Sequence, residues 1–337
     1  MPVRKPDGAW YHWGMTPTNV LLAALACLLG AAAAAPAAAQ SYPVKPIRIV
    51  VPFAPGGPND ILARLLGQRL SAAWGQQAIV DNRPGGGTVI GTDIVAKSPP
   101  DGYTLLMVST SHAANPTLMA KLPFDTLRDF APVIQAVSNP NLLVVHPSVP
   151  ARNVKELIAV ARARPGEIAY ASGGTGSATH LAGELLRLSA GVSMTHVPYK
   201  GASPATVDLI SGQVSWMFGT ILPTLPHVKS GKLRAIAVSG AKRSAVLPEL
   251  ATVAETVPGF EASSWYGVFA PAGTPAEIIT RLNQEMARGL NAPDVRERLA
   301  REGTDVVAGS PEAFGNLFRA EVVKWGKVIK AAGIRPE

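Results

Sequence analysis

The chain has 337 residues, of which 47% are hydrophobic and 16% charged, and its formal net charge is +8. Its single cysteine, Cys27, excludes a disulfide within the chain and a site built from several cysteines. The basic residues are scattered and form no compact stripe with interleaved aromatics, which argues against nucleic acid as a partner.

The N-terminus is typical of a cleavable export signal at residues 1–39. Arg4 and Lys5 supply a positive start, and a mainly apolar run extends from Val20 to Ala39. The run ends in three alanines, a small-x-small site that signal peptidase accepts before Gln40. Export predicts a periplasmic protein, and removal of the signal leaves about 300 residues, enough for two domains.

An uncleaved membrane anchor is the alternative, because about 20 apolar residues can span a bilayer. The half of the run nearest the mature chain is mostly alanine and contains Pro36, which favours cleavage. The start codon stays open between Met1 and Met15, although a start at Met15 discards both basic residues.

Short β-branched runs then alternate with helical patterns along the chain. Strands are expected at residues 47–53, 103–108, 131–137, 142–145, 168–171, 192–197, 214–218, 233–238 and 266–270. Helices are expected at residues 61–70, 154–163, 181–190, 275–290, 294–301 and 311–332. The alternation predicts an α/β protein with parallel, doubly wound sheets, in which ligands bind at the carboxyl ends of strands.

Two glycine-rich loops share one construction, in which a strand is followed by glycines and then by a helix. They run from Pro52 to Asp60 and from Ser172 to His180. A helix N-terminus presents unpaired N–H groups and a partial positive charge, so it can hold an anion. Either loop alone is explained equally well as a tight turn, but the two together favour a facing pair of anion-binding loops.

Several polar residues near these loops have a plainer interpretation. Ser177, and either Asn59 or Asp60, are natural helix N-caps. His180 has no second histidine at metal-ligand spacing and is expected in the wall of the site. Arg83 has the chemistry to pair with a carboxylate, but a solvated arginine is the simpler interpretation.

The sequence offers little for catalysis. It has no G-x-S-x-G motif, and the loop from Ser172 to Ser177 lacks the lysine of a phosphate-binding P-loop. The histidines form no H-x-x-x-H or H-E-x-x-H pattern. We therefore expect a binding protein that is not an enzyme and that needs no metal or cofactor.

The mature chain resembles the tripartite tricarboxylate transporter substrate-binding family, the Bug-type receptors. Segments that match the family in order cover nearly all of it. They include Lys45-Pro46-Ile47-Arg48, the Pro-Gly-Gly loop ending at Asp60, Asn82-Arg83-Pro84-Gly85, Pro100-Asp101-Gly102-Tyr103, Gly176-Ser177, His180-Leu181-Ala182-Gly183-Glu184, Val197-Pro198-Tyr199-Lys200-Gly201 and Ser264-Trp265-Tyr266-Gly267.

The resemblance implies a type II-like periplasmic binding protein fold with two α/β lobes and a central cleft. One lobe is expected at about residues 41–135 plus 235–310 and the other at 136–234, with the helix at 311–337 unassigned. Carried over by position, the ligand-binding residues of one lobe are Phe53, Gly56, Gly57 and Asp60. Those of the other are Ser172, Thr175, Ser177, Thr179 and His180, to which Gly176 is added because its backbone is expected to approach the ligand.

The implied function is capture of a small organic carboxylate by lobe closure, in a monomer that delivers it to permease subunits of a tripartite tricarboxylate-type system. The alternative is a receptor that signals its liganded state to a membrane sensor protein. The chain departs from the family at Ser215 and Gly219, where aspartates are frequent. An ammonium group would need such a carboxylate, so the departure favours a plain or aromatic carboxylate over an amino acid.

Overall fold

The computed structural model describes residues 6–7, 42–119 and 121–334. The chain divides into two units, residues 1–44 and 45–337. In the first unit the peptide bond between Tyr42 and Pro43 is cis. The predicted signal at 1–39 lies outside the described residues except for Pro6 and Asp7. Within the described part, no helix combines the length and the apolar character that a bilayer crossing requires.

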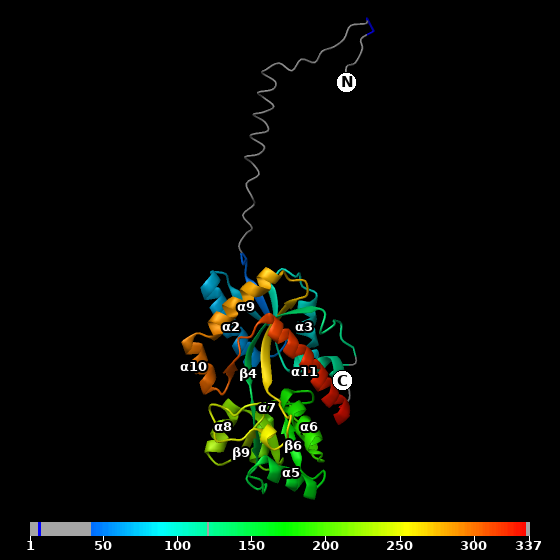
Figure 1. The fold of residues 1–337 in the computed structure, drawn as a ribbon, viewed down its shortest axis with the longest axis vertical. Helices are drawn as coiled ribbons and strands as arrows, with labels where there is room; N and C mark the ends of the chain where they lie inside the picture. The colour runs from blue at the N-terminus through cyan, green and yellow to red at the C-terminus, as the bar shows by residue number, and fades with distance from the viewer. Residues whose placement is uncertain (1–5, 8–41, 120, 335–337) are drawn as a thin grey trace. The chain divides into compact units, whose positions relative to one another are not determined.

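The second unit contains two β-sheets, each at the centre of one lobe (Figure 1). The first sheet has six strands in the order β11-β4-β10-β3-β1-β2. In chain order they are β1 (Ile47–Val51), β2 (Ala78–Asn82), β3 (Thr104–Ser109), β4 (Phe130–Asn139), β10 (Ser264–Pro271) and β11 (Asp305–Val306).

The second sheet has five strands in the order β7-β6-β8-β5-β9. They are β5 (Asn141–Val145), β6 (Ala169–Ser172), β7 (Thr195–Pro198), β8 (Trp216–Thr220) and β9 (Arg234–Val238). The sheets therefore take their strands from different stretches of the chain, while the exact lobe boundaries stay a prediction.

The expectation of parallel sheets was correct only in part. β1 pairs in parallel with β2 and β3, but β10 runs antiparallel to both β3 and β4. In the second sheet β5 runs antiparallel to β8 and β9. The reason is topological: β4 takes the chain out of the first sheet and β10 brings it back, so neighbouring crossing strands point in opposite directions.

Helices cover the sheets on both sides. In the first lobe α2 (Pro58–Trp74) and α9 (Ala276–Leu290) pack against each other, with α3 (Val89–Ala96) on the other side of the sheet (Figure 1). The remaining helices are α4 (Ser111–Leu118), α5 (Val154–Ala163), α6 (Ala178–Ala190), α7 (Ala202–Ile210), α8 (Ile221–Lys229), α10 (Pro293–Arg301) and α11 (Pro311–Ala332). Short 3-10 turns occur at Gly86–Thr88 and Val253–Glu255.

The helices α3, α4, α7 and α8 were not anticipated from the sequence. Each has only eight or nine residues, so its hydrophobic periodicity is brief. Prolines inside α4 and α8, Pro116 and Pro226, further obscure the pattern because proline normally breaks a helix. Tertiary packing, more than local preference, makes these segments helical.

A buried polar cluster joins the lobes where the chain crosses between them. The Ser239 hydroxyl accepts a hydrogen bond from the Asn141 backbone amide at 2.8 Å and donates one to the Ala262 carbonyl at 2.9 Å. Asn141 and Ser239 are fully buried. The two crossing segments, one leaving β4 and one approaching β10, are thereby held together.

The C-terminal helix belongs to neither lobe alone. α11 packs against α4 and β4 of the first lobe and also against α6 of the second. Glu321 anchors it from a buried position, where its carboxylate accepts hydrogen bonds from the indole N–H groups of Trp265, at 3.1 Å, and Trp325, at 2.6 Å. The helix thus forms a second structural connection between the lobes.

Candidate functional site

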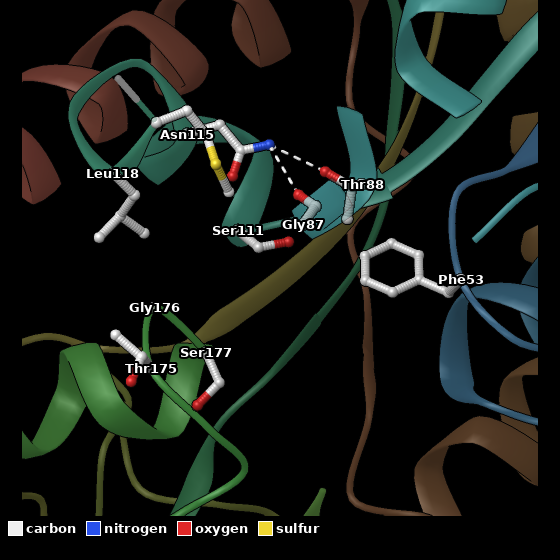
Figure 2. A pocket seen from close by; sticks show the side chains of 10 residues that line it. Phe53, Gly87, Thr88, Ser111, Asn115, Leu118, Thr175, Gly176 and Ser177 are labelled. Atoms are coloured by element: carbon white, nitrogen blue, oxygen red, sulfur yellow. Dashed lines mark hydrogen bonds between the residues drawn. The ribbon is translucent and has the colours of Figure 1, made fainter. Parts of the chain in front are cut away.

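A cavity of about 170 Å³ lies where loops of the two lobes meet; we call it the first cavity. Its first-lobe wall comes from segments that come after β1, β2 and β3, and its second-lobe wall from the loop between β6 and α6 (Figure 2). The lining residues are Phe53, Gly87, Thr88, Ser111, Asn115, Leu118, Met119, Thr175, Gly176 and Ser177. None of these side chains is charged, so an anion there would meet hydroxyls, amides and backbone dipoles.

The β6–α6 loop is organised by its own side chains. Ser177 is the N-cap of α6, as predicted, because its hydroxyl oxygen accepts a hydrogen bond from the His180 amide at 3.2 Å. The Thr179 hydroxyl lies 3.1 Å from that of Ser177 and accepts from the Gly173 amide at 3.0 Å. These bonds fix the helix N-terminus that faces the first cavity.

The backbone amides of this loop have two different roles, which the sequence did not reveal. The amide of Gly174 donates to the Ser172 hydroxyl at 3.1 Å, and that of Gly176 to Nδ1 of His180 at 3.0 Å. These donors hold the loop in shape. The Thr175 amide makes no hydrogen bond to another described residue, so it and the first turn of α6 are the donors left for an anion.

His180 and His196 support the loop from behind. Their rings stack with centroids 3.8 Å apart, and Nε2 of His196 lies 2.7 Å from the Ser172 hydroxyl. Burial, reinforced by the neighbouring His196, lowers the pKa of His180 to about 4. A neutral His180 ring is what the Gly176 amide requires, because Nδ1 must carry a free lone pair to accept its hydrogen bond.

Gly176 marks a close approach of the two lobes in the first cavity. Its φ is +75°, a region that favours glycine, and a Cβ placed there would lie 2.5 Å from Cδ1 of Leu118. Leu118 belongs to α4 of the first lobe. The backbone conformation therefore favours glycine, and any side chain would also have to displace the end of the leucine packed on it from the opposite lobe.

On the first-lobe side, Asn115 organises the wall. Its side-chain amide donates to the Gly87 carbonyl at 3.3 Å and to the Thr88 hydroxyl at 2.8 Å (Figure 2). Beside it, the buried hydroxyl of Ser111 has no hydrogen-bond partner among the described residues. A buried hydroxyl is costly to leave unpaired, so Ser111 is a group that a ligand oxygen would satisfy.

The loop between β1 and α2 is held by Asp60. The carboxylate accepts from the Gly56 amide at 2.9 Å and from Nε of Arg64 at 3.0 Å. The hydrogen bond from Arg64 holds the pKa of Asp60 below its usual range, against the effect of burial. The expectation that Asn59 or Asp60 is the N-cap was wrong: Gly57 occupies that position, because Pro58 already begins the helix.

A second cavity, of about 350 Å³, lies elsewhere between the lobes. It is lined by Gly56, Pro58, Ile61, Leu62, Leu65, Val137, Asn139, Thr220, Pro223, Tyr266, Arg298, Leu299, Glu302 and Thr304. These residues come from α2, β4, β10 and the α10 region of the first lobe and from the start of α8 in the second. The loop after β1 therefore serves both cavities, with Phe53 in the first and Gly56 in the second.

The structure separates the ten predicted ligand-binding residues into groups. Phe53, Thr175, Gly176 and Ser177 line the first cavity, and Gly56 lines the second. The others line neither cavity and instead shape the loops: Gly57, Asp60, Ser172, Thr179 and His180.

Sequence reasoning missed the wall residues Asn115, Leu118 and Met119. All three belong to the unexpected helix α4 or to its C-terminal end. Arg83 does not line either cavity; it is half exposed and pairs with Asp81, with Nε 2.9 Å from Oδ1.

Gly219, one of the departures from the family pattern, lies near the end of β8. It lines a third cavity of about 290 Å³ between α7 and α8, together with the neighbouring Thr220. A Cβ at position 219 would lie 2.5 Å from Oγ1 of Thr224. The buried Thr224 thus occupies space that any side chain at this position would need.

Comparison with known proteins agrees with this architecture. Residues 62–334 match the model of the tripartite tricarboxylate transporter family receptor. The chain is 41% identical over 292 residues to a UPF0065 protein from the tcbD-tcbE intergenic region of a Pseudomonas strain, covering 86% of this chain and 87% of the relative. It is 40% identical over 319 residues to Protein BugT of Bordetella pertussis, covering 94% and 98%.

Solved structures are similar to this chain in fold as well as in sequence. Rpa4515 of Rhodopseudomonas palustris with adipate is 41% identical, with a TM-score of 0.77, covering 88% of this chain and 100% of that one. MatC from the same organism, with bound malate, is 33% identical with a TM-score of 0.73, covering 86% and 100%. The chain itself therefore belongs to the tripartite tricarboxylate transporter family of solute-binding receptors.

Proposed function

We propose that this receptor captures a small organic carboxylate in the first cavity and delivers it to a tripartite tricarboxylate-type transporter. The observation that carries the proposal is the composition of that cavity, which is lined by the hydroxyl-bearing residues Thr88 and Ser111 of one lobe and Thr175 and Ser177 of the other. The N-terminus of α6 adds unpaired N–H groups and a partial positive charge. Adipate and malate in the related structures are carboxylates, which supports the same class here.

Capture requires both lobes, since each supplies part of the wall. A ligand that contacts both loops favours the closed state by its extra affinity for that state. In this proposal the chain is exported with a cleavable signal and acts as a monomer without catalysis. Delivery to permease subunits is supported by the family description, which is that of a transporter receptor.

The proposal is tested by calorimetric titration of the mature protein with mono-, di- and tricarboxylates, after a thermal-shift screen. Ser177→Ala should weaken binding of the best carboxylate by roughly 5- to 150-fold, about 1 to 3 kcal/mol for a lost hydrogen bond to a charged group.

Ser310→Ala is the matched control. Ser310 caps α11 through the same kind of bond, its hydroxyl accepting from the Ala313 amide at 3.1 Å, but it lies outside both cavities. Both variants should lose about 1 kcal/mol of stability, and only Ser177→Ala should lose affinity. Equal affinities in the two variants, or no carboxylate bound by the wild type, would reject the proposal.

A further inference from the structure

We propose that the second cavity determines specificity by taking the hydrocarbon body, aliphatic or aromatic, of a carboxylate whose anionic end occupies the first cavity. This inference rests on the function proposed above and names the class of ligand. It predicts that the receptor discriminates among carboxylates by the length and apolar area of the hydrocarbon attached to the carboxyl group.

The walls of the second cavity are suited to hydrocarbon. Leu62, Leu65 and Leu299 are buried aliphatic side chains, and Val137 adds a fourth from β4. Ile61 continues this surface on α2, although it is partly exposed at 42%. Where the cavity leaves part of this apolar wall accessible, as at Ile61, covering it with another apolar group gains free energy in proportion to the area removed from water.

The sizes of the cavities assign different parts of a ligand to them. The first cavity, at about 170 Å³, is small and has four hydroxyl-bearing residues in its wall beside Phe53, Leu118 and Met119, whereas the second, at about 350 Å³, falls in the range of sites for whole organic ligands. A carboxylate group needs little more room than the first cavity offers. The larger space is therefore available to the remainder of the molecule.

Two structural links place the cavities next to each other. The loop after β1 contributes Phe53 to one and Gly56 to the other. On the opposite wall, Tyr266 of the second cavity is paired in the sheet with Ser109, two residues before Ser111 of the first. One ligand can therefore contact both without leaving the space between the lobes.

The polar groups of the second cavity leave its apolar wall available. Arg298 and Glu302, which carry the charges of the lining, lie close to each other, with 3.5 Å between Nε and Oε1, so their opposite charges partly offset. The Tyr266 side chain is buried, and burial raises the pKa of its hydroxyl to about 12. Oδ1 of Asn139 is buried without a partner among the described residues. Such groups, inside an apolar wall, are the usual means by which a pocket fixes one polar atom of a ligand.

The test is a calorimetric series of linear monocarboxylates from four to eight carbons. In the wild type, each added methylene that enters the cavity should tighten binding about fourfold, which is the free energy of burying one methylene. Ile61→Trp would fill the mouth of the cavity from a partly exposed position. It should therefore leave the affinity for the shortest acid unchanged and abolish the increase in affinity with chain length.

Val323→Trp provides the control, since Val323 is also an exposed aliphatic residue on a helix but lines neither cavity. Affinities in the wild type that do not vary with chain length, or equal affinities in Ile61→Trp and Val323→Trp, would overturn the inference while leaving carboxylate capture intact. If no carboxylate binds, the proposed function fails and the inference falls with it. If Ser177→Ala lowers the affinity for every acid of the series by the same factor, the anionic end is held in the first cavity as proposed.

Discussion

The ring of His180 lies flat against that of His196, with centroids 3.8 Å apart and planes inclined by 12°. Three further side chains lie around the two rings: Tyr170 on β6, and Glu184 and Arg187 on the same helix as His180. The Tyr170 hydroxyl donates a hydrogen bond to the Glu184 carboxylate, which also forms an ion pair with Arg187 at 2.7 Å. Two imidazoles at this distance cannot both hold a proton without repulsion, and both rings have a lowered pKa, chiefly because of burial.

The histidine pair predicts acid sensitivity. The pKa of His180 is about 4 in the folded protein and 6.5 without its surroundings, so the unfolded chain binds more protons between these values. The contribution of His180 to the free energy of unfolding, of order 3 kcal/mol, is fully present above pH 6.5 and is lost as the pH falls towards 4. Chemical unfolding at pH 7.5, 6 and 5 should show a steeper loss of stability in the wild type than in His180→Asn. Identical pH profiles would contradict this role.

A side chain at position 176 should be unfavourable. Gly176→Val should reduce carboxylate affinity about tenfold or more, because the new side chain meets Leu118 and the backbone φ of +75° disfavours a β-branched residue. Gly173→Ala is the matched control: its φ is not positive and its added Cβ would meet other atoms only at 3.7 Å or beyond.

Leu118→Ala separates the two causes of the Gly176 effect. If the clash dominates, combining Leu118→Ala with Gly176→Ala should restore part of the lost affinity; if the backbone conformation dominates, it should not. Titrations of the folded variants decide between them. Wild-type binding by Gly176→Val would remove this glycine from the site.

The buried cluster between the lobes should be sensitive to loss of one hydroxyl. Ser239→Ala leaves the Asn141 amide without its acceptor in a fully buried position, which should cost about 1 to 3 kcal/mol in the free energy of unfolding. Ser211→Ala, which removes an exposed hydroxyl bonded to the Asp208 carbonyl at 3.1 Å, should cost less than about 0.5 kcal/mol. Denaturant titration measures both, and equal costs would show that the cluster has no special role.

Much of the fold could be predicted because its strongest signals are local. The helix at Val154–Ala163 and the long helix at Pro311–Ala332 lie where their apolar periodicity predicts them, and Ser177 caps α6 as its position suggested. The strand direction of β10 could not be predicted in this way, because it depends on where the chain returns after forming the second lobe.

The candidate site was predicted less completely, for a physical reason. Glycine-rich loops are visible in a sequence, and Gly176 with its neighbours does line the first cavity. Leu118 and Asn115 belong to a helix of eight residues interrupted by a proline, and their distance from Gly176 along the chain hides their proximity to it. Whether a polar side chain faces a ligand or its own loop, as for Thr179 and His180, depends on hydrogen-bond geometry that the sequence does not contain.

Export should remove residues 1–39. The three alanines before Gln40 form the expected cleavage site, so the intact mass of protein from the periplasmic fraction should correspond to a chain that begins at Gln40 or within a few residues of it. Substitution of Ala39 by a bulky residue should retain the precursor. Full-length chain pelleting with membranes would instead indicate an uncleaved anchor.

The lack of charged side chains around the first cavity has a consequence for how the receptor would respond to its medium. Dissolved ions weaken attraction between exposed charges over a Debye length of about 8 Å at physiological ionic strength, but they act little on enclosed dipoles. An anion held by hydroxyls and a helix terminus would therefore lose less affinity as salt is added than one held by exposed charged side chains. The rate of encounter, which depends on the net positive charge of the whole molecule, would slow more clearly.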